Sequence, residues 1–187
     1  MTLLPLPFAL ETAVEHQIVA DPEWQRGVLW GTPRPGHPEG QVLHHIQDVL
    51  QNVDAVFGNH PQREQLRQIA LIHDSFKQQA RERVPKQSHG LVAREFAEKY
   101  LEETAVLLVI EHHDDAYKAY RSISQGGNEA DAIQQAKALI DLLAQSIDLF
   151  LAFYWCDSCV PGKTAVHYHW FKQLTQAASC SEGDQTT

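Results

Sequence analysis

The stretch Leu71-Ile72-His73-Asp74 is the most informative part of the sequence, because a histidine and a carboxylate end an apolar run. Burying both groups costs several kcal/mol unless each is satisfied, most cheaply by a metal ion or an ion pair. Adjacent residues of a helix point about 100° apart, so both can bind one ion only if other segments complete its shell. Alone, the dipeptide is equally well explained by a histidine that interacts with the C-terminal dipole of its helix.

Helical periodicity dominates on both sides of this stretch. A first amphipathic helix is indicated by the spacing of Val42, Ile46, Val49, Val53 and Val56. Gln125-Gly126-Gly127-Asn128 is a clear break. Loops are expected at 21–41, where prolines and glycines concentrate, and at 80–88. Further helices are predicted at about 66–72, 88–100, 102–121, 129–156 and 163–177. The sequence therefore predicts an all-α protein with one domain over residues 1–178 and a disordered tail at 179–187.

Composition limits the function classes that are open. The chain has 187 residues, of which 43% are hydrophobic, and this fits one globular domain with a sizeable core. Its formal net charge of −9 argues against general nucleic-acid binding, which needs clustered Lys and Arg, but not against a small phosphorylated substrate. The N-terminal residues lack the basic region of a secretory signal, and no apolar run reaches ~20 residues. We therefore expect a cytoplasmic protein without a membrane-spanning segment.

Several other segments also place a histidine or an aspartate beside residues expected in the core. His45 lies on the apolar stripe that contains Ile46 and Val49, although a lone inward histidine is more often a hydrogen-bonded core residue than a ligand. His89 begins one predicted helix, and His113 follows an apolar stretch of another. Asp157 ends the hydrophobic part of the long helix predicted at 129–156. If the chain folds so that these segments converge, a metal site results.

The order of these residues resembles the HD-domain superfamily of metal-dependent phosphohydrolases. The pattern His…His-Asp…His…His…Asp occurs here as His45, His73-Asp74, His89, His113 and Asp157. The local sequences are also similar to those of the family: HPEGQVLHHIQDVL (37–50), LIHDSFK (71–77), SHGLVAREFAEKYL (88–101), LVIEHHDDAYKAYR (108–121) and FYWCDSCVPGK (153–163). The resemblance covers about residues 37–163. It implies a compact bundle of about six to eight helices around a metal site.

The resemblance also implies roles for individual residues. His45, His73, Asp74 and Asp157 would bind one divalent metal ion, and His89 and His113 would bind a second ion or contact the substrate phosphate. His45 is preferred over its neighbour His44, and His113 over His112. These donor types suit Mn, Fe, Co, Ni, Zn or Mg, as one or two ions. The residues expected to take part in catalysis are Asp74, Lys77, His89 and His113.

Lys77 lies one turn beyond Asp74, where the family has a phosphate-binding lysine, and a solvent-facing lysine is an equally good interpretation. Arg94 and Arg121 are weaker candidates for the same role. Phe76 replaces the glycine that usually precedes this lysine. Some family nucleotidases have a catalytic glutamate at the position of Lys77, and its absence argues against that particular mechanism.

The expected function is hydrolysis of a phosphomonoester or phosphodiester in a small substrate, such as a nucleotide, by metal-activated water. A diiron oxygenase with the same ligand order and a non-catalytic, metal-stabilised ligand-binding module are the alternatives. The oligomeric state is open, with a homodimer as one candidate. Cys156-x-x-Cys159 lacks the second pair that a zinc site needs. His167 and His169 are expected on a helix surface.

Overall fold

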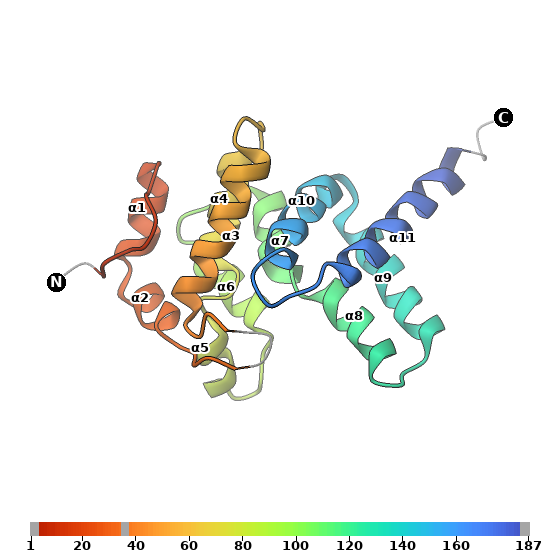
Figure 1. Cartoon of the computed structure of the whole chain (residues 1–187), viewed down its shortest axis with the longest axis horizontal. Helices are drawn as coiled ribbons and strands as arrows, with labels where there is room; N and C mark the ends of the chain where they lie inside the picture. Colours follow the sequence, from red (N-terminus) through yellow and green to blue (C-terminus); the bar gives the residue numbers. More distant parts are fainter. Residues whose placement is uncertain (1–3, 35–37, 184–187) are drawn as a thin grey trace.

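The computed structural model describes residues 4–34 and 38–183, with side chains up to residue 178 (Figure 1). All regular elements of these residues are helices, which confirms the predicted all-α class. The helices are more numerous than the sequence pattern indicated, and their bounds differ from the predicted ones. They are α1 (Ala13–Ala20), α2 (Pro22–Val28), α3 (Val42–Phe57), α4 (Arg63–Ile72), α5 (Lys77–Glu82), α6 (His89–Ala97), α7 (Thr104–His112), α8 (Asp115–Ser124), α9 (Glu129–Leu143), the 3₁₀ turn η1 (Ala144–Ser146), α10 (Ile147–Ser158) and α11 (Val166–Gly183).

Two segments predicted as loops contain short helices. In 21–41, Asp21 caps α2 by accepting a hydrogen bond from the Glu23 backbone N–H at 2.7 Å, and Pro22 takes the first helical position. Both residues favour a helix start, a signal that the proline and glycine content of the segment obscured. In 80–88, α5 extends to Glu82 and buries Ala80. The loop predictions were therefore wrong over these residues.

Two helices predicted as continuous are each broken. The segment 102–121 divides into α7 and α8 at His113-Asp114, and 129–156 divides into α9 and α10 at Ala144, whose φ of 35° is left-handed. The first break lies in the polar run Glu111-His112-His113-Asp114-Asp115, and neither break contains the glycine or proline that usually marks a helix end. The break after α7 matters most, because it turns the chain at one of the expected ligands.

The C-terminal helix is longer than predicted. α11 continues to Gly183 instead of ending near residue 177. The tail predicted as disordered at 179–187 is therefore helical as far as 183, and residues 184–187 lie outside the described part of the chain.

The helices form two groups with a shared middle (Figure 1). α1 to α6 lie toward one end, α8, α9 and α11 lie toward the other, and α7 and α10 lie between them. α3 packs on α4, α6 on α7, α8 on α9, and α10 contacts both α3 and α4. Buried side chains from all of these helices make one hydrophobic core. The middle of the molecule is where the helix ends that carry the expected ligands meet.

Close backbone contacts hold the segment after α4 in place. Trp24 of α2 donates its indole N–H to the Leu71 carbonyl at 2.7 Å, and the Ser75 hydroxyl donates to the same oxygen at 2.8 Å. Gly27 of α2 lies so close that an added Cβ would be 1.8 Å from the Ser75 carbonyl oxygen. Only glycine permits this approach. The short helix α2 thus packs against the turn that contains His73 and Asp74 and fixes its position.

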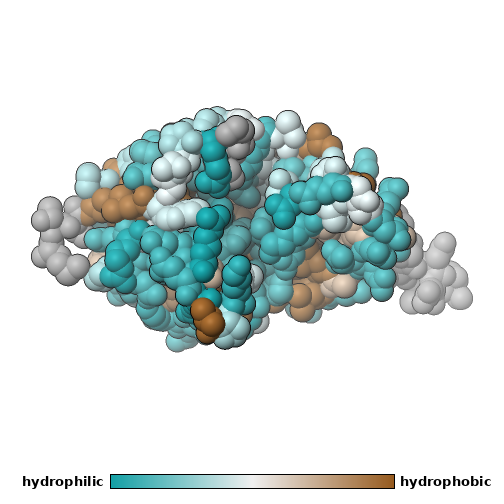
Figure 2. Space-filling model, turned by 90° about the horizontal axis from the view of Figure 1, so that it is seen from below, coloured by the Kyte–Doolittle hydropathy of each residue, from teal (hydrophilic) through white to brown (hydrophobic). Residues whose placement is uncertain are grey.

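The segment Glu129–Ser158 is long and apolar enough to cross a membrane by length and composition alone. The structure divides it into α9 and α10, and 44% of its most apolar window is buried inside the protein. Core helices of soluble proteins pass the same test, so this is weak evidence for a membrane span. The face in Figure 2 is mainly hydrophilic. The absence of a membrane span stays a prediction.

Candidate metal centre

The six expected ligands all lie at or near helix ends. His45 is in the first turn of α3, and His73 caps the C-terminus of α4 with Asp74 directly after it. His89 is the first residue of α6, with Ser88 as its N-cap, and His113 caps the C-terminus of α7. Asp157 is in the last turn of α10. Helices that are distant in sequence therefore meet end to end and bring these side chains together.

His45, His73 and Asp157 form one group. One ligand atom from each lies within 4.8 Å of the others, a spacing that can hold a metal ion. His45 Nε2 is 2.9 Å from Asp157 Oδ1 and 3.3 Å from His73 Nε2. Asn52 of α3 donates to the Cys156 carbonyl at 2.8 Å and so fixes α10 against α3 beside this group.

Asp74, His89 and His113 form a second group with the same spacing. The Nε2 atoms of His89 and His113 are 3.0 Å apart, and they lie 3.3 Å and 3.4 Å from Asp74 Oδ1. Gly90 makes this approach possible, because an added Cβ would be 2.1 Å from the Glu111 carbonyl oxygen of α7. Here too a glycine lets two helices, α6 and α7, approach closely at the site.

The Asp74 carboxylate lies between the two groups. Its Oδ1 faces His89 and His113, while its Oδ2 is 3.6 Å from both His45 Nε2 and His73 Nε2. A single side chain thus presents one oxygen to each group. Asp74 could therefore contribute to a metal site in either group.

The hydrogen bonds around the histidines orient their rings toward the cluster. His73 Nδ1 is 3.0 Å from the Ala70 carbonyl and His113 Nδ1 is 2.8 Å from the Ile110 carbonyl. A carbonyl only accepts, so each Nδ1 carries a proton and each ring turns its Nε2 toward the cluster. His45 Nδ1 is buried without a hydrogen-bond partner. Lone pairs and carboxylate oxygens converge here, and a bound cation would satisfy them.

Burial and neighbouring charges set the protonation states. Burial lowers the pKa of His73 to about 3, so this imidazole is neutral at physiological pH. Burial alone would raise the pKa values of Asp74 and Asp157, but nearby charges, led by Lys77 and Lys163 respectively, hold both well below their usual range. Neutral imidazole and ionised carboxylate are the forms that bind metal ions.

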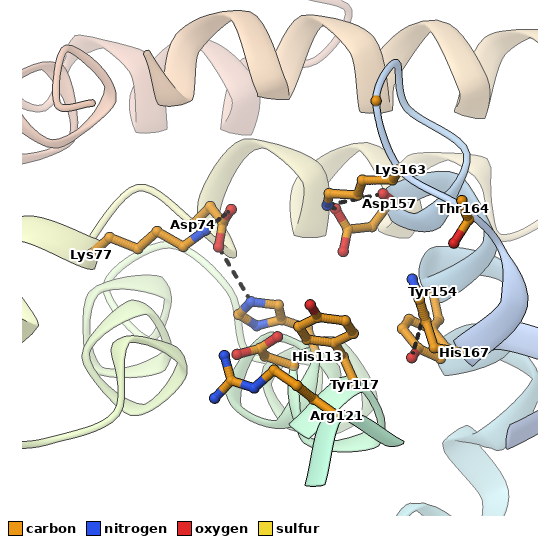
Figure 3. A pocket seen from close by; sticks show the side chains of 12 residues that line it. Asp74, Lys77, His113, Tyr117, Arg121, Tyr154, Asp157, Lys163, Thr164 and His167 are labelled. Atoms are coloured by element: carbon orange, nitrogen blue, oxygen red, sulfur yellow. Dashed lines mark hydrogen bonds and ion pairs between the residues drawn. The ribbon is translucent and has the colours of Figure 1, made fainter. Parts of the chain in front are cut away.

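A cavity of about 440 Å³ opens beside the cluster (Figure 3). Asp74, His113 and Asp157 reach it from the cluster side, and Lys77, Arg121 and Lys163 add positive charge to its walls. Its volume suits a small molecule. The arrangement therefore combines a metal-type donor set with a cationic pocket for an anion.

The structure brings together all the expected site residues and separates the doublets. His45 is buried whereas His44 is exposed, and His113 is buried whereas His112 pairs with Asp115 at 2.8 Å. Lys77 makes an ion pair with Asp74 at the cavity edge.

The two weaker candidates lie in different places. Arg121 lines the cavity. Arg94 instead pairs with Glu98 and Glu111, both away from the cavity lining. The free cysteines Cys156 and Cys159 flank Asp157 and belong to neither ligand group.

Sequence reasoning missed several residues of the cavity wall. His167, expected on a helix surface, is buried, and its Nδ1 is 2.7 Å from the Tyr154 hydroxyl; His169 is exposed as expected. Lys163 Nζ is 2.9 Å from Asp157 Oδ1. The one available signal for Lys163 was the turn Pro161-Gly162, which returns the chain toward Asp157.

Comparison with known proteins agrees with this geometry. The family model described as HD domain matches residues 40–150, which is more than half of the chain. The chain belongs to the HD-domain family. The superfamily is one of metal-dependent phosphohydrolases. The match contains His45, His73, Asp74, His89 and His113, while Asp157 lies beyond its end and joins the site through the fold alone. Neither the curated proteins nor the solved structures contain a significant match.

Proposed function

We propose that this HD-domain protein is a metal-dependent hydrolase of a phosphomonoester or phosphodiester in a small substrate. The observation that carries the proposal is the position of Asp74, whose two carboxylate oxygens face two histidine-containing groups beside a cationic cavity. His45, His73 and Asp157 would hold one divalent ion, and His89 and His113 a second, with Asp74 shared. Such ions polarise a phosphoryl oxygen and make water a stronger nucleophile near neutral pH.

The side chains of the cavity would bind and orient the phosphate. Lys77 and Arg121 reach the cavity from α5 and α8, on the side of Asp74 and His113. Their positive charges offset the repulsion between a phosphate dianion and the ionised Asp74 and Asp157. Lys163 pairs with Asp157 and keeps that carboxylate ionised and in place. Tyr154 and His167, hydrogen-bonded to each other, form the wall opposite Lys77 (Figure 3).

The test combines metal analysis with turnover. Purified protein should hydrolyse p-nitrophenyl phosphate or bis-p-nitrophenyl phosphate when Mn²⁺ is supplied, and a chelator should remove the activity. His73→Ala and Asp74→Ala should each lose both bound metal and turnover. Unchanged metal content in both variants would overturn the assigned site. His44→Ala is the matched control, since His44 is exposed next to His45, and it should retain both properties.

The same preparation separates the alternative functions. Two irons per chain with an oxygen-dependent visible band, and no hydrolysis, would establish the oxygenase. Bound metal with neither turnover nor an oxygen-dependent band, across monoester and diester substrates, would establish a ligand-binding module. The donor set of histidines and carboxylates suits Mn, Fe, Co, Ni, Zn and Mg alike, so metal analysis must be done on protein expressed without metal supplementation as well.

A further inference from the structure

A second cavity, of about 680 Å³, adjoins the one at the metal centre. The two share Lys77, Asp114 and Arg121 along their common edge, and His89 of the ligand cluster lines the second cavity as well. We call it the basic annexe after its cationic lining: Arg34, Lys77, Arg81, Lys86, Lys118 and Arg121. Asp114 is its one acidic lining residue among those the structure describes.

The charge of the basic annexe is largely uncompensated. Within the described residues, seven Lys and Arg side chains make no ion pair, and four of them, Arg34, Arg81, Lys86 and Arg121, line this one cavity. Lys77 pairs with Asp74, and Lys118 with Asp114 and Asp115. In a chain with a net charge of −9, a concentration of free cations in one cavity is unexpected for an ordinary surface. It creates a local positive field inside a negatively charged molecule.

Two of these cations are held in position by Trp30. The guanidinium carbon of Arg81 is 4.7 Å from the centroid of the indole ring, and that of Arg34 is 6.0 Å away. A guanidinium held against an aromatic face keeps the N–H donors at its edge free for a bidentate contact with phosphate. Trp30 therefore pre-organises the two donors, and less side-chain entropy is lost when an anion binds.

We propose that the basic annexe binds a second phosphate group of the substrate. This rests on the proposed function, which assigns the first phosphate to the metal centre. The substrate would then be a small molecule with two phosphate groups separated by a spacer, one at Asp74 and the other near Arg34, Arg81 and Lys86. Lys77 and Arg121, which line both cavities, would lie along the spacer.

A small molecule fits better than a nucleic acid. The volume of the basic annexe is in the range of small-molecule sites. A polyanion would also extend over the rest of a surface whose net charge repels it.

The test is calorimetric titration of Mn²⁺-loaded protein with two matched probes, 1,4-butanediol bisphosphate and butyl monophosphate. Under conditions without turnover, the wild type should bind the bisphosphate at least tenfold more tightly. Arg81→Ala/Lys86→Ala should lower this ratio about tenfold, since it removes two of the cations that would contact the second phosphate. Lys137→Ala, which removes a cation outside both cavities, should leave the ratio unchanged.

The outcomes separate the two proposals. Equal affinities of the two probes for the wild type, or an unchanged ratio in Arg81→Ala/Lys86→Ala, would overturn the assignment of the basic annexe. Tighter binding of a short single-stranded oligonucleotide than of the bisphosphate would overturn it in favour of a nucleic-acid site. Failure to hydrolyse any phosphoester would overturn only the proposed function, because the probes report binding without turnover. Circular dichroism of each variant shows that a changed ratio does not come from misfolding.

Discussion

The protein buries two clusters of charged side chains, and they satisfy their charges in different ways. Arg67 and Glu15 are almost fully buried, and Arg67 donates to both Glu15 oxygens, to the Ala9 carbonyl and to Asp54. Donors and acceptors match in this pair. In the cluster around Asp74, four histidines and two carboxylates face one another, Lys77 and Lys163 pair with the carboxylates, and the buried His45 Nδ1 has no hydrogen-bond partner. Both look alike in a sequence, and only the count of donors against acceptors separates a structural pair from a site that fits a cation.

The largest effect on stability is expected at the buried ion pair between Arg67 and Glu15. Arg67→Ala leaves the Glu15 carboxylate buried without its partner, which should lower the free energy of unfolding by about 3–5 kcal/mol. Because this pair needs no cation, the loss should be the same with and without a chelator in urea denaturation. Arg63→Ala, which breaks more exposed pairs with Glu11 and Asp54, is the control and should cost about 1 kcal/mol or less. If the stability lost in Arg67→Ala depended on the chelator, the ion pair would be coupled to a bound metal ion, and the two clusters would not differ in the way described.

Metal removal should lower stability through the cluster around Asp74 and not through the Arg67–Glu15 pair. With free metal at about 100 times its dissociation constant, chelation should destabilise the wild type by about 3 kcal/mol, because the bound ion stabilises only the folded state. Asp74→Asn keeps the shape of the side chain but removes its charge, and its stability should not respond to the chelator. A chelator effect of wild-type size in Asp74→Asn would show that the cation binds elsewhere.

Gly90→Ala tests how closely the second histidine group depends on backbone contact. The added Cβ would meet the Glu111 carbonyl, so α6 must move away from α7 and carry His89 from His113. Overpacking of this kind costs about 1–3 kcal/mol, and bound metal per chain should fall. Gly126→Ala is a control with backbone strain from its positive φ but with no atom within 4 Å of the new Cβ. It should lose up to about 1 kcal/mol and keep its metal.

The smallest effect concerns His167, a buried histidine outside both ligand groups. Burial lowers its pKa below the ordinary 6.5, so as pH falls below 6.5 the unfolded chain takes up a proton that the folded chain resists. The contribution of His167 to stability is therefore present above pH 6.5 and is lost toward acid. Between pH 7.5 and 5.5, His167→Gln should lose slightly less stability than the wild type, by less than about 1 kcal/mol. A larger loss in the variant would contradict the lowered pKa.

The helical class could be predicted because it depends on local patterns, and the order of the six candidate ligands was recognisable from the family resemblance; their role as ligands stays a prediction. The buried face of α3 appears in the spacing of its apolar residues, and the same pattern separates His45 from His44. The breaks at His113-Asp114 and Ala144 were not predicted, because neither contains a glycine or a proline and tertiary packing decides where each helix stops. Lys163 and His167 enter the cavity only through the turn at Pro161-Gly162. The basic annexe could not be predicted from the sequence, since its cations come from segments far apart in the sequence.

The contact between Trp30 and the two arginines gives the protein a built-in optical probe. Indole emission responds to nearby charge and to the movement of quenching groups. The chain has four tryptophans, and the signal of Trp30 can be isolated from that of Trp24, Trp155 and Trp170 by comparison with Trp30→Phe. Occupancy of the basic annexe can therefore be followed in the unlabelled protein, and large collections of candidate anions can be screened before any substrate is known.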